Sequence, residues 1–261
     1  MRDRKAPKGL DEQHPDFVME RLQSGAQKLG LSLSPRQLSQ FYIYYQELLA
    51  WNQRLNLTRI TDYEDVQIKH FLDSLTVSLV WPSRKKGVAL RVIDVGTGAG
   101  LPGLPLKISF PDIELTLLEA TTKKTAFLRH LSQKLGLGDV TIAVGRAEDI
   151  AHQSQYRECF DQVLGRGVAP LFTLAELALP FCRIGGSFVA LKKGKIESEI
   201  AQASRAINLL GGKLQEIKGI SLAEFSDQRQ LVVVSKVSPT PEPYPRRPGI
   251  PRKRPLLAPA G

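Results

Sequence analysis

The stretch of sequence that decides the fold is Arg91-Val92-Ile93-Asp94-Val95-Gly96-Thr97-Gly98-Ala99-Gly100-Leu101-Pro102-Gly103. Its apolar start ends in Asp94 and gives way to alternating glycines. A second apolar run, residues 113–118, ends in Glu119. Glycines let the backbone approach a ligand closely, and an acidic residue after the second strand accepts hydrogen bonds from ribose hydroxyls. The pattern therefore predicts a nucleotide-shaped cofactor held at the edge of a parallel sheet.

Two registers of these glycines indicate different cofactors. Residues 98–103 fit the dinucleotide fingerprint G-x-G-x-x-G, but they contain Pro102 and start too far beyond Asp94 for a pyrophosphate to meet the helix N-terminus directly. Residues 96–100 fit the G-x-G-x-G loop of S-adenosylmethionine-dependent methyltransferases. The Asp94 carboxylate tolerates a ligand with an ammonium and a sulfonium, whereas it would repel phosphates. The methyltransferase register is favoured, while the dinucleotide register and a ligand-free turn remain open.

Composition limits the class of protein. The chain has 261 residues, 42% of them hydrophobic, a net charge of +10 and a pI near 9.7. This charge favours an anionic partner such as nucleic acid or an acidic membrane surface, with a merely basic soluble protein as the alternative. Two cysteines and four histidines without a C-x-x-C motif argue against a zinc site and a disulfide framework, so we expect no metal. Without an apolar signal segment or membrane-length run, a cytoplasmic protein is expected.

The chain divides into four regions by pattern. Residues 1–14 are expected to be disordered, and residues 15–82 to form a helical subdomain, with helix starts at Ser34-Pro35-Arg36-Gln37 and Thr61-Asp62-Tyr63-Glu64. Residues 83–237 alternate strands and helices, which predicts an α/β, doubly wound, mostly parallel sheet of seven strands that ends in an antiparallel hairpin. Together with the favoured register of the glycine loop, this predicts a Rossmann-like class I methyltransferase fold. The expected strands are 91–95, 113–119, 140–144, 160–165, 187–192, 213–219 and 230–237, and the main helices are 123–137, 170–182 and 196–210.

The remaining residues, 238–261, form a basic tail rich in proline. Eight of its 24 residues are proline, and five Lys or Arg side chains stand against Glu242. A segment of this composition does not form a core of its own, so we expect it to be extended. An arm that follows a phosphate backbone and a disordered, solubilising terminus are equally compatible with the composition.

Several polar residues are candidates for the site. His70, Asp73 and Ser74 have the residue types of a hydrolase triad, but they lie too close together on one helix and no G-x-S-x-G elbow exists. Ala147 and Glu148 follow the third strand and suit an adenine edge, with a solvated turn as the alternative. Arg166 ends the fourth strand and should point into the ligand crevice. Further lysines follow the fifth strand, where substrate would enter: Lys192, Lys193 and Lys195.

Together these motifs resemble the bacterial 16S rRNA (guanine-N7) methyltransferases of the RsmG family, also called glucose-inhibited division protein B. The departures are Leu101, where the family often has Phe, and Gly165 and Gly167, where Ala is common. The matching segments are Trp51-Asn52-Gln53-Arg54-Leu55-Asn56-Leu57-Thr58, His70-Phe71-Leu72-Asp73-Ser74-Leu75, residues 94–108, Lys123-Lys124 with Phe127-Leu128, Gly145-Arg146-Ala147-Glu148, Arg166 with Val168-Ala169, Arg229-Gln230-Leu231-Val232-Val233 and Tyr244-Pro245-Arg246-Arg247-Pro248-Gly249.

The resemblance implies S-adenosylmethionine as the methyl donor and one guanine in the decoding-region loop of 16S rRNA as the acceptor. The substrate would be the small ribosomal subunit or a late precursor, and we expect a monomer without a protein partner or membrane. The resemblance implies cofactor contacts from Gly96, Leu101, Glu119, Ala120, Thr121, Ala147, Glu148 and Arg166, to which the loop pattern adds Asp94, Gly98 and Gly100.

Guanine N7 carries a free lone pair, so the reaction needs no general base and its catalysis should come from in-line positioning. Because A-form RNA hides N7 in a deep groove, we expect a loop or a splayed base as substrate. Our hypothesis is that the wall facing the guanine contains Arg166, Asn56, Thr58, His70 and Lys192.

Three other functions fit parts of the sequence. An NAD-dependent oxidoreductase would bind NAD and not S-adenosylmethionine, and a non-catalytic ribosome-assembly factor would bind subunits with little cofactor affinity. A methyltransferase for protein or small molecules would often carry N/D-P-P-Y/F after the fourth strand. Residues 164–167 read Leu-Gly-Arg-Gly there, which argues against exocyclic or amide nitrogen chemistry.

Overall fold

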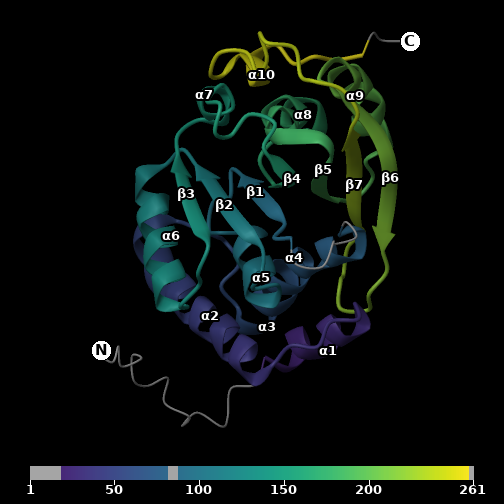
Figure 1. Cartoon of the computed structure of the whole chain (residues 1–261). Coiled ribbons are helices and arrows are strands. Elements are labelled where there is room, and N and C mark those ends of the chain that lie inside the picture. The colour runs from purple at the N-terminus through teal and green to yellow at the C-terminus, as the bar shows by residue number, and fades with distance from the viewer. Residues whose placement is uncertain (1–18, 82–87, 259–261) are drawn as a thin grey trace.

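A computed structural model describes residues 19–81 and 88–258. The expectation of a disordered N-terminus, residues 1–14, lies outside the described residues. One seven-stranded sheet stands between two layers of helices (Figure 1). Its strands run in the order β3-β2-β1-β4-β5-β7-β6. Their bounds are β1 Arg91–Val95, β2 Glu114–Glu119, β3 Val140–Val144, β4 Phe160–Arg166, β5 Cys182–Lys193, β6 Gly212–Ile220 and β7 Arg229–Lys236.

The pairing of the strands confirms the predicted α/β class and the final hairpin. Strands β1 to β5 pair in parallel, whereas β7 lies antiparallel between β5 and β6. Strand order reverses between β2-β1 and β4, and parallel sheets bind ligands outside the carboxyl ends of their strands at such a point. At this edge Glu119 and Arg166 end their strands, and Asp94 is the last residue but one of β1.

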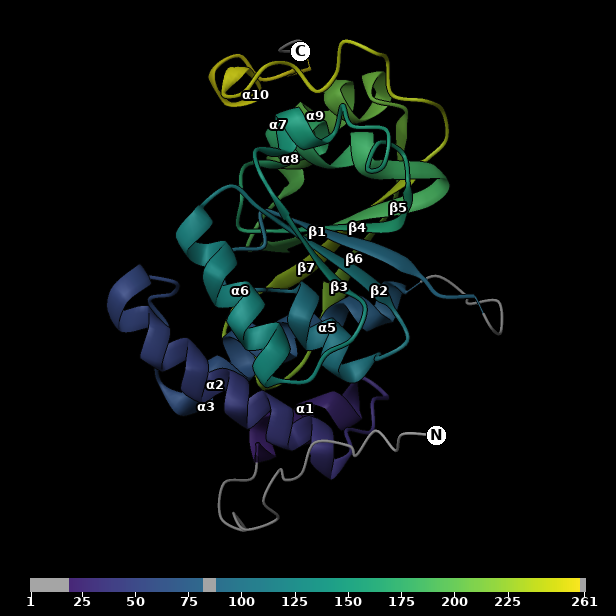
Figure 2. The ribbon, with the colours of Figure 1, turned by 60° about the vertical axis from the view of Figure 1, so that its left-hand side comes forward.

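Helices between residues 20 and 134 cover one face of the sheet (Figure 2). Side chains such as Phe41, Leu72 and Phe127 pack there against Leu117 and Leu231. The elements of this face are α1 Glu20–Lys28, α2 Pro35–Leu55, α3 Tyr63–Val66, the π-helical turn η1 Gln67–Leu72, α4 Asp73–Leu75, the 3-10 turn η2 Thr76–Val80, α5 Gly103–Ser109 and α6 Thr122–Lys134.

The other face carries a second core, in which Phe181 and Leu174 pack against Val163 and Val232. Its elements are α7 Ala147–Ile150, α8 Leu171–Ala178, the 3-10 turn η3 Leu179–Phe181, α9 Glu197–Leu209 and α10 Ile250–Lys253. The helix predicted at 170–182 ends early because Pro180 lacks the N–H that an α-helix needs. Strand β5 accordingly begins at Cys182 and not at residue 187. Within the described residues, each helix is too short or too polar to cross a bilayer.

The two predicted helix starts have different outcomes. Ser34 caps α2 as predicted: its hydroxyl accepts from the Gln37 N–H, and the Gln37 side chain accepts from the Ser34 N–H. The second start lies one residue later than predicted. Asp62, and not Thr61, caps α3 by accepting the Asp65 N–H at 2.9 Å. A carboxylate is the stronger acceptor at a helix N-terminus, which explains the shift.

The prediction of an extended tail is wrong. Residues 238–258, which we call the C-terminal strap, lie folded against α7, α8 and α9 at the top of the molecule (Figure 1). Proline contributes carbonyl acceptors without N–H donors, and the body supplies the donors: Arg157 donates to the carbonyls of Thr240, Pro241 and Tyr244. The composition predicted correctly that the segment has no core of its own. The strap instead packs on the core of the domain, to which Leu256 and Tyr244 contribute.

Candidate functional site

The glycine loop between β1 and α5 is held from below by Asp94. One carboxylate oxygen accepts the Thr97 hydroxyl at 2.6 Å and the Gly103 N–H at 2.9 Å, which fixes both ends of the loop. Its other oxygen is buried without a partner among the described residues. Burial raises the pKa of Asp94 to about 6. Asp94 thus lies beneath the loop and holds its shape.

A helix far away in the sequence supports the same loop. The buried Tyr44 hydroxyl on α2 donates to the Ala99 carbonyl at 2.5 Å. Sequence reasoning assigned the aromatic stripe of α2 to the core and missed this contact. The backbone of the loop needs glycine: Gly96 has φ +69, and a Cβ there would lie 2.9 Å from the Val168 side chain. At φ +92, Gly100 leaves equally little room, because its Cβ would lie 2.9 Å from the Tyr44 hydroxyl.

A cavity of about 210 Å³ opens at the carboxyl ends of β1, β2 and β3. Glu119 stands on its wall, where its two oxygens accept the Gly98 N–H at 3.1 Å and the Thr121 N–H at 2.8 Å. The predicted residues on this wall are Gly96, Glu119, Ala120, Ala147 and Glu148; the others are Val95, Leu118, Gly145, Arg146, Val168, Ala169, Thr173, Leu177, Gly249, Pro251 and Arg252. The other predicted contacts do not line this cavity: Asp94, Gly98, Gly100, Leu101, Thr121 and Arg166.

A cluster of charged side chains lies next to the loop, which we call the Asp73 cluster. Asp73 accepts Arg166 at one oxygen and Arg229 at the other, each at 2.8 Å. Arg229 also donates to Asp227. Asp73 and Arg229 are almost fully buried, and 16% of the Arg166 side chain is exposed. A buried aspartate shared by two arginines fixes the position of both guanidinium groups.

His70 extends this cluster toward Thr58. Its Nδ1 lies 3.2 Å from Arg166 Nη2, and its Nε2 lies 2.8 Å from the Thr58 hydroxyl. Nδ1 also lies 3.2 Å from the Lys69 carbonyl, so this nitrogen meets both a donor, Arg166, and an acceptor, Lys69. Burial, followed by the charge of Arg166, lowers the pKa of His70 to about 3. His70 is therefore a neutral positioning group whose nitrogens both have partners.

Within the described residues, two predicted wall residues make no hydrogen bond to His70 or Arg166. Asn56 ends α2 in the left-handed conformation and is exposed. Lys192 faces the opposite side of the sheet, where it donates to the Ala169 carbonyl and to Glu199. Because side chains alternate along a strand, Lys193 shares the face of the Asp73 cluster. Burial and the neighbouring Arg229 lower the pKa of Lys193.

The reversed strand order, the acidic residues at the carboxyl ends of β1 and β2 and the glycine loop define the Rossmann-like fold of class I methyltransferases. Among solved structures, the chain is similar to precorrin-6y C5,15-methyltransferase from Geobacter metallireducens, with a TM-score of 0.47 and 15% identity over 63% of this chain and 88% of that one. TrmN from Thermus thermophilus likewise has a TM-score of 0.47 and 16% identity, covering 66% of this chain and 53% of that one.

Sequence comparison gives the family. The family model of GidB, rRNA small subunit methyltransferase G, matches residues 37–232. A Dehalococcoides mccartyi protein named ribosomal RNA small subunit methyltransferase G is 52% identical over 239 residues, which is 92% of this chain and all of the relative. A Roseiflexus castenholzii protein with the same name is 48% identical with the same coverage. The chain belongs to the rRNA small subunit methyltransferase G family, as the sequence motifs indicated.

Proposed function

We propose that the protein transfers a methyl group from S-adenosylmethionine to N7 of one guanine in the decoding-region loop of 16S rRNA. The observation that carries this proposal is the junction at Arg166. This side chain belongs to the Asp73 cluster and ends β4, the strand that pairs with β1, and its charge acts on Asp94 beneath the glycine loop. Cofactor and acceptor base would meet at that junction.

The residues on the cavity wall fit the proposed cofactor. A ribose offers two hydroxyl groups, and Glu119 presents a carboxylate on the wall at the end of β2. The Gly96 backbone allows close approach, because no side chain stands between it and the cavity. The unpartnered Asp94 oxygen adds negative potential under the loop, which favours a cationic ligand over a dinucleotide. When bound, the cofactor supplies an electrophilic methyl group on a positively charged sulfur.

The side chains of the Asp73 cluster support chemistry without a general base. His70 is the nearest titratable ring, and its pKa of about 3 and two occupied nitrogens make it a poor proton acceptor for a substrate. N7 of guanine needs no deprotonation. Arg166 and Thr58 are then positioning residues that orient the base, and rate enhancement comes from holding the nucleophile in line.

The acceptor is proposed from charge and from the family. A net charge of +10 suits a polyanion, and the curated relatives carry the name of a small-subunit rRNA methyltransferase. Lys193 and Arg229 add positive charge on the cluster side of β5 and β7. A splayed guanine would present N7 to this side while its flanking phosphates meet basic side chains.

Transfer of labelled methyl from S-adenosylmethionine to small subunits from cells that lack this enzyme tests the proposal. We expect label on one 16S guanine, identified as 7-methylguanosine after nuclease digestion. Label on another atom or another RNA would contradict the acceptor. If calorimetry shows cofactor binding but no methyl is transferred to the subunit, the cofactor site would stand and the acceptor would be a different molecule.

A further inference from the structure

The C-terminal strap reaches the cofactor cavity. Three of its residues, Gly249, Pro251 and Arg252, line the cavity together with Glu119 and Ala147. Pro251 is buried, whereas Arg252 is exposed at the rim. A segment beyond the seven-stranded sheet thus supplies part of the wall where the base of the cofactor is expected.

The strap also holds a side chain that was predicted to bind the cofactor. The Gly249 N–H donates to a carboxylate oxygen of Glu148 at 3.0 Å, and Arg146 lies 3.9 Å from the other oxygen. Glu148 is only 7% exposed. Gly249 has φ +83, a conformation that favours glycine and that turns the chain into α10 at this point. The backbone of the strap therefore fixes the orientation of Glu148.

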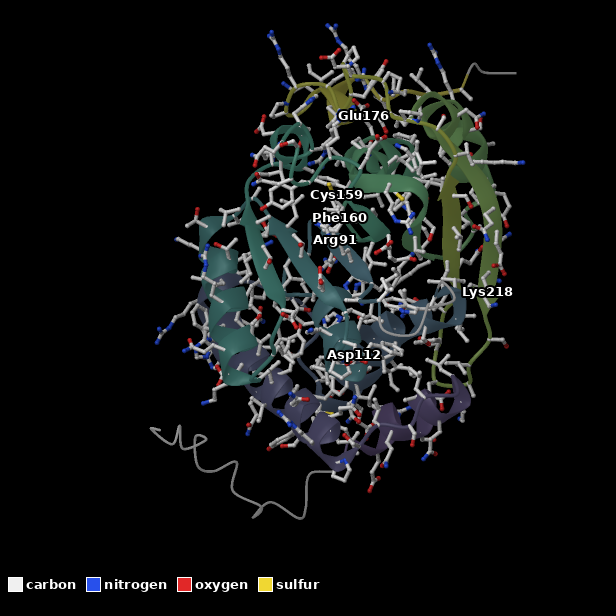
Figure 3. The ribbon with its side chains drawn as sticks, viewed as in Figure 1. Arg91, Asp112, Cys159, Phe160, Glu176 and Lys218 are labelled. Carbon is white, nitrogen blue, oxygen red and sulfur yellow. The ribbon has the colours of Figure 1, made fainter. Side chains whose placement is uncertain are left out.

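Two anchors keep this part of the strap in place. Arg246 meets the fully buried Glu176 of α8 through its backbone N–H at 2.9 Å and through side-chain bonds of 2.8 and 2.6 Å. Figure 3 labels Glu176 just beneath the strap. On the other side of Gly249, the Thr173 hydroxyl donates to the Pro251 carbonyl at 3.3 Å. Charge-assisted bonds to a buried carboxylate are strong and directional, so residues 246–251 are held on both sides of Gly249.

We propose that residues 246–252 of the strap are part of the cofactor site, with Gly249 positioning Glu148 and Arg252 forming the outer wall against the adenine. This proposal rests on the proposed function. A planar guanidinium stacks on aromatic rings and is weakly hydrated, so it suits the exposed face of a purine. Lys253 and Arg254, which follow Arg252 in the strap, do not line the cavity.

A matched pair of variants, one in α10 and one at the residue that follows it, tests the role of Arg252. Arg252→Ala and Arg254→Ala remove the same charge from exposed positions two residues apart, and only Arg252 lines the cavity. Calorimetric titration of the full-length chain with S-adenosylhomocysteine, the non-reactive product, gives the Kd. We expect Arg252→Ala to raise the Kd roughly tenfold and Arg254→Ala to change it by less than about twofold.

Hydrogen exchange of the wild-type chain supplies a readout that needs no variant. S-adenosylhomocysteine should slow exchange at the amides of residues 249–253, while the exposed face of α9 stays unchanged. Equal Kd values for the two variants, or unchanged exchange in the strap on binding, would overturn the proposal. A wild-type chain that binds neither S-adenosylmethionine nor S-adenosylhomocysteine would overturn the proposed function itself.

Discussion

The glycine loop and the Asp73 cluster lie side by side but are built in opposite ways. The loop takes its main contacts from neighbours in sequence: Asp94 binds Thr97 and Gly103 within ten residues. The cluster joins Asp73 to Arg229, 156 positions away, and to Arg166, 93 positions away. A motif of neighbouring residues can be recognised in the sequence, whereas a cluster of distant charges forms only when the sheet brings its residues together. The loop should therefore tolerate loss of tertiary contacts better than the cluster does.

The largest expected effect comes from removing the centre of the cluster. Asp73→Ala leaves Arg166 and the buried Arg229 without their shared counter-charge, and breaking a buried pair costs about 3–5 kcal/mol. Asp65→Ala, which removes the exposed pair with Lys69, is the control and should cost less than about 1 kcal/mol. Urea unfolding measures both. Similar losses for the two variants would show that the cluster does not stabilise the fold.

The pH dependence of stability should have opposite signs in the two regions. The pKa of Asp94 is raised from 3.8 to about 6, so its contribution is present below pH 3.8 and is lost as the pH rises through 6. The pKa of His70 is lowered from 6.5 to about 3, so its contribution is present above pH 6.5 and is lost as the pH falls through 3. Each effect is on the order of a few kcal/mol.

Asp94→Asn and His70→Gln separate these contributions. As the pH rises from about 4 to about 7, the unfolding free energy of the wild type should fall relative to that of Asp94→Asn. As the pH falls over the same range, the unfolding free energy of the wild type should fall relative to that of His70→Gln. Parallel curves for the two variants would contradict the assignment.

A glycine substitution tests whether the loop's shape serves the ligand. Gly96→Ala places a side chain at φ +69 and 2.9 Å from Val168, and Gly136→Ala creates the same backbone strain at φ +62 in open space. Both should lose about 1–2 kcal/mol of stability. Only Gly96→Ala should weaken S-adenosylmethionine binding, by roughly tenfold or more in a calorimetric Kd. An unchanged Kd would place the ligand away from this glycine.

The sequence predicted what local pattern controls. Strand alternation, the final hairpin, the Ser34 cap and the glycine loop all depend on neighbouring residues, and the structure has them. The sequence did not show on which face of the sheet Lys192 lies. A strand that is buried on both faces is a continuous apolar run without alternation, so the face of each side chain cannot be predicted from it. The strap was predicted to be extended from its own composition alone. Its position depends on Glu176, a buried carboxylate 70 residues earlier in the sequence that pairs with Arg246.

The smallest effect distinguishes adjacent lysines on β5. Lys193→Ala should weaken binding of small-subunit rRNA several-fold and reduce the salt slope by about 1, because Lys193 shares the face of the cluster. Lys192→Ala should change neither, since Glu199 holds that lysine on the other face. Filter binding over a salt series measures both variants. A larger effect for Lys192 would restore the original prediction.

The most direct test of the account is Arg166→Ala, because this side chain joins the loop to the cluster. Calorimetry gives the Kd for S-adenosylmethionine, and single-turnover transfer to small subunits at saturating cofactor gives the rate, with folding checked by circular dichroism. We predict a higher Kd and a lower rate. Arg183→Ala, which removes a half-exposed arginine from its pair with Asp161, is the control and should change neither. Wild-type values of both quantities in folded Arg166→Ala would contradict a single site shared by the two regions.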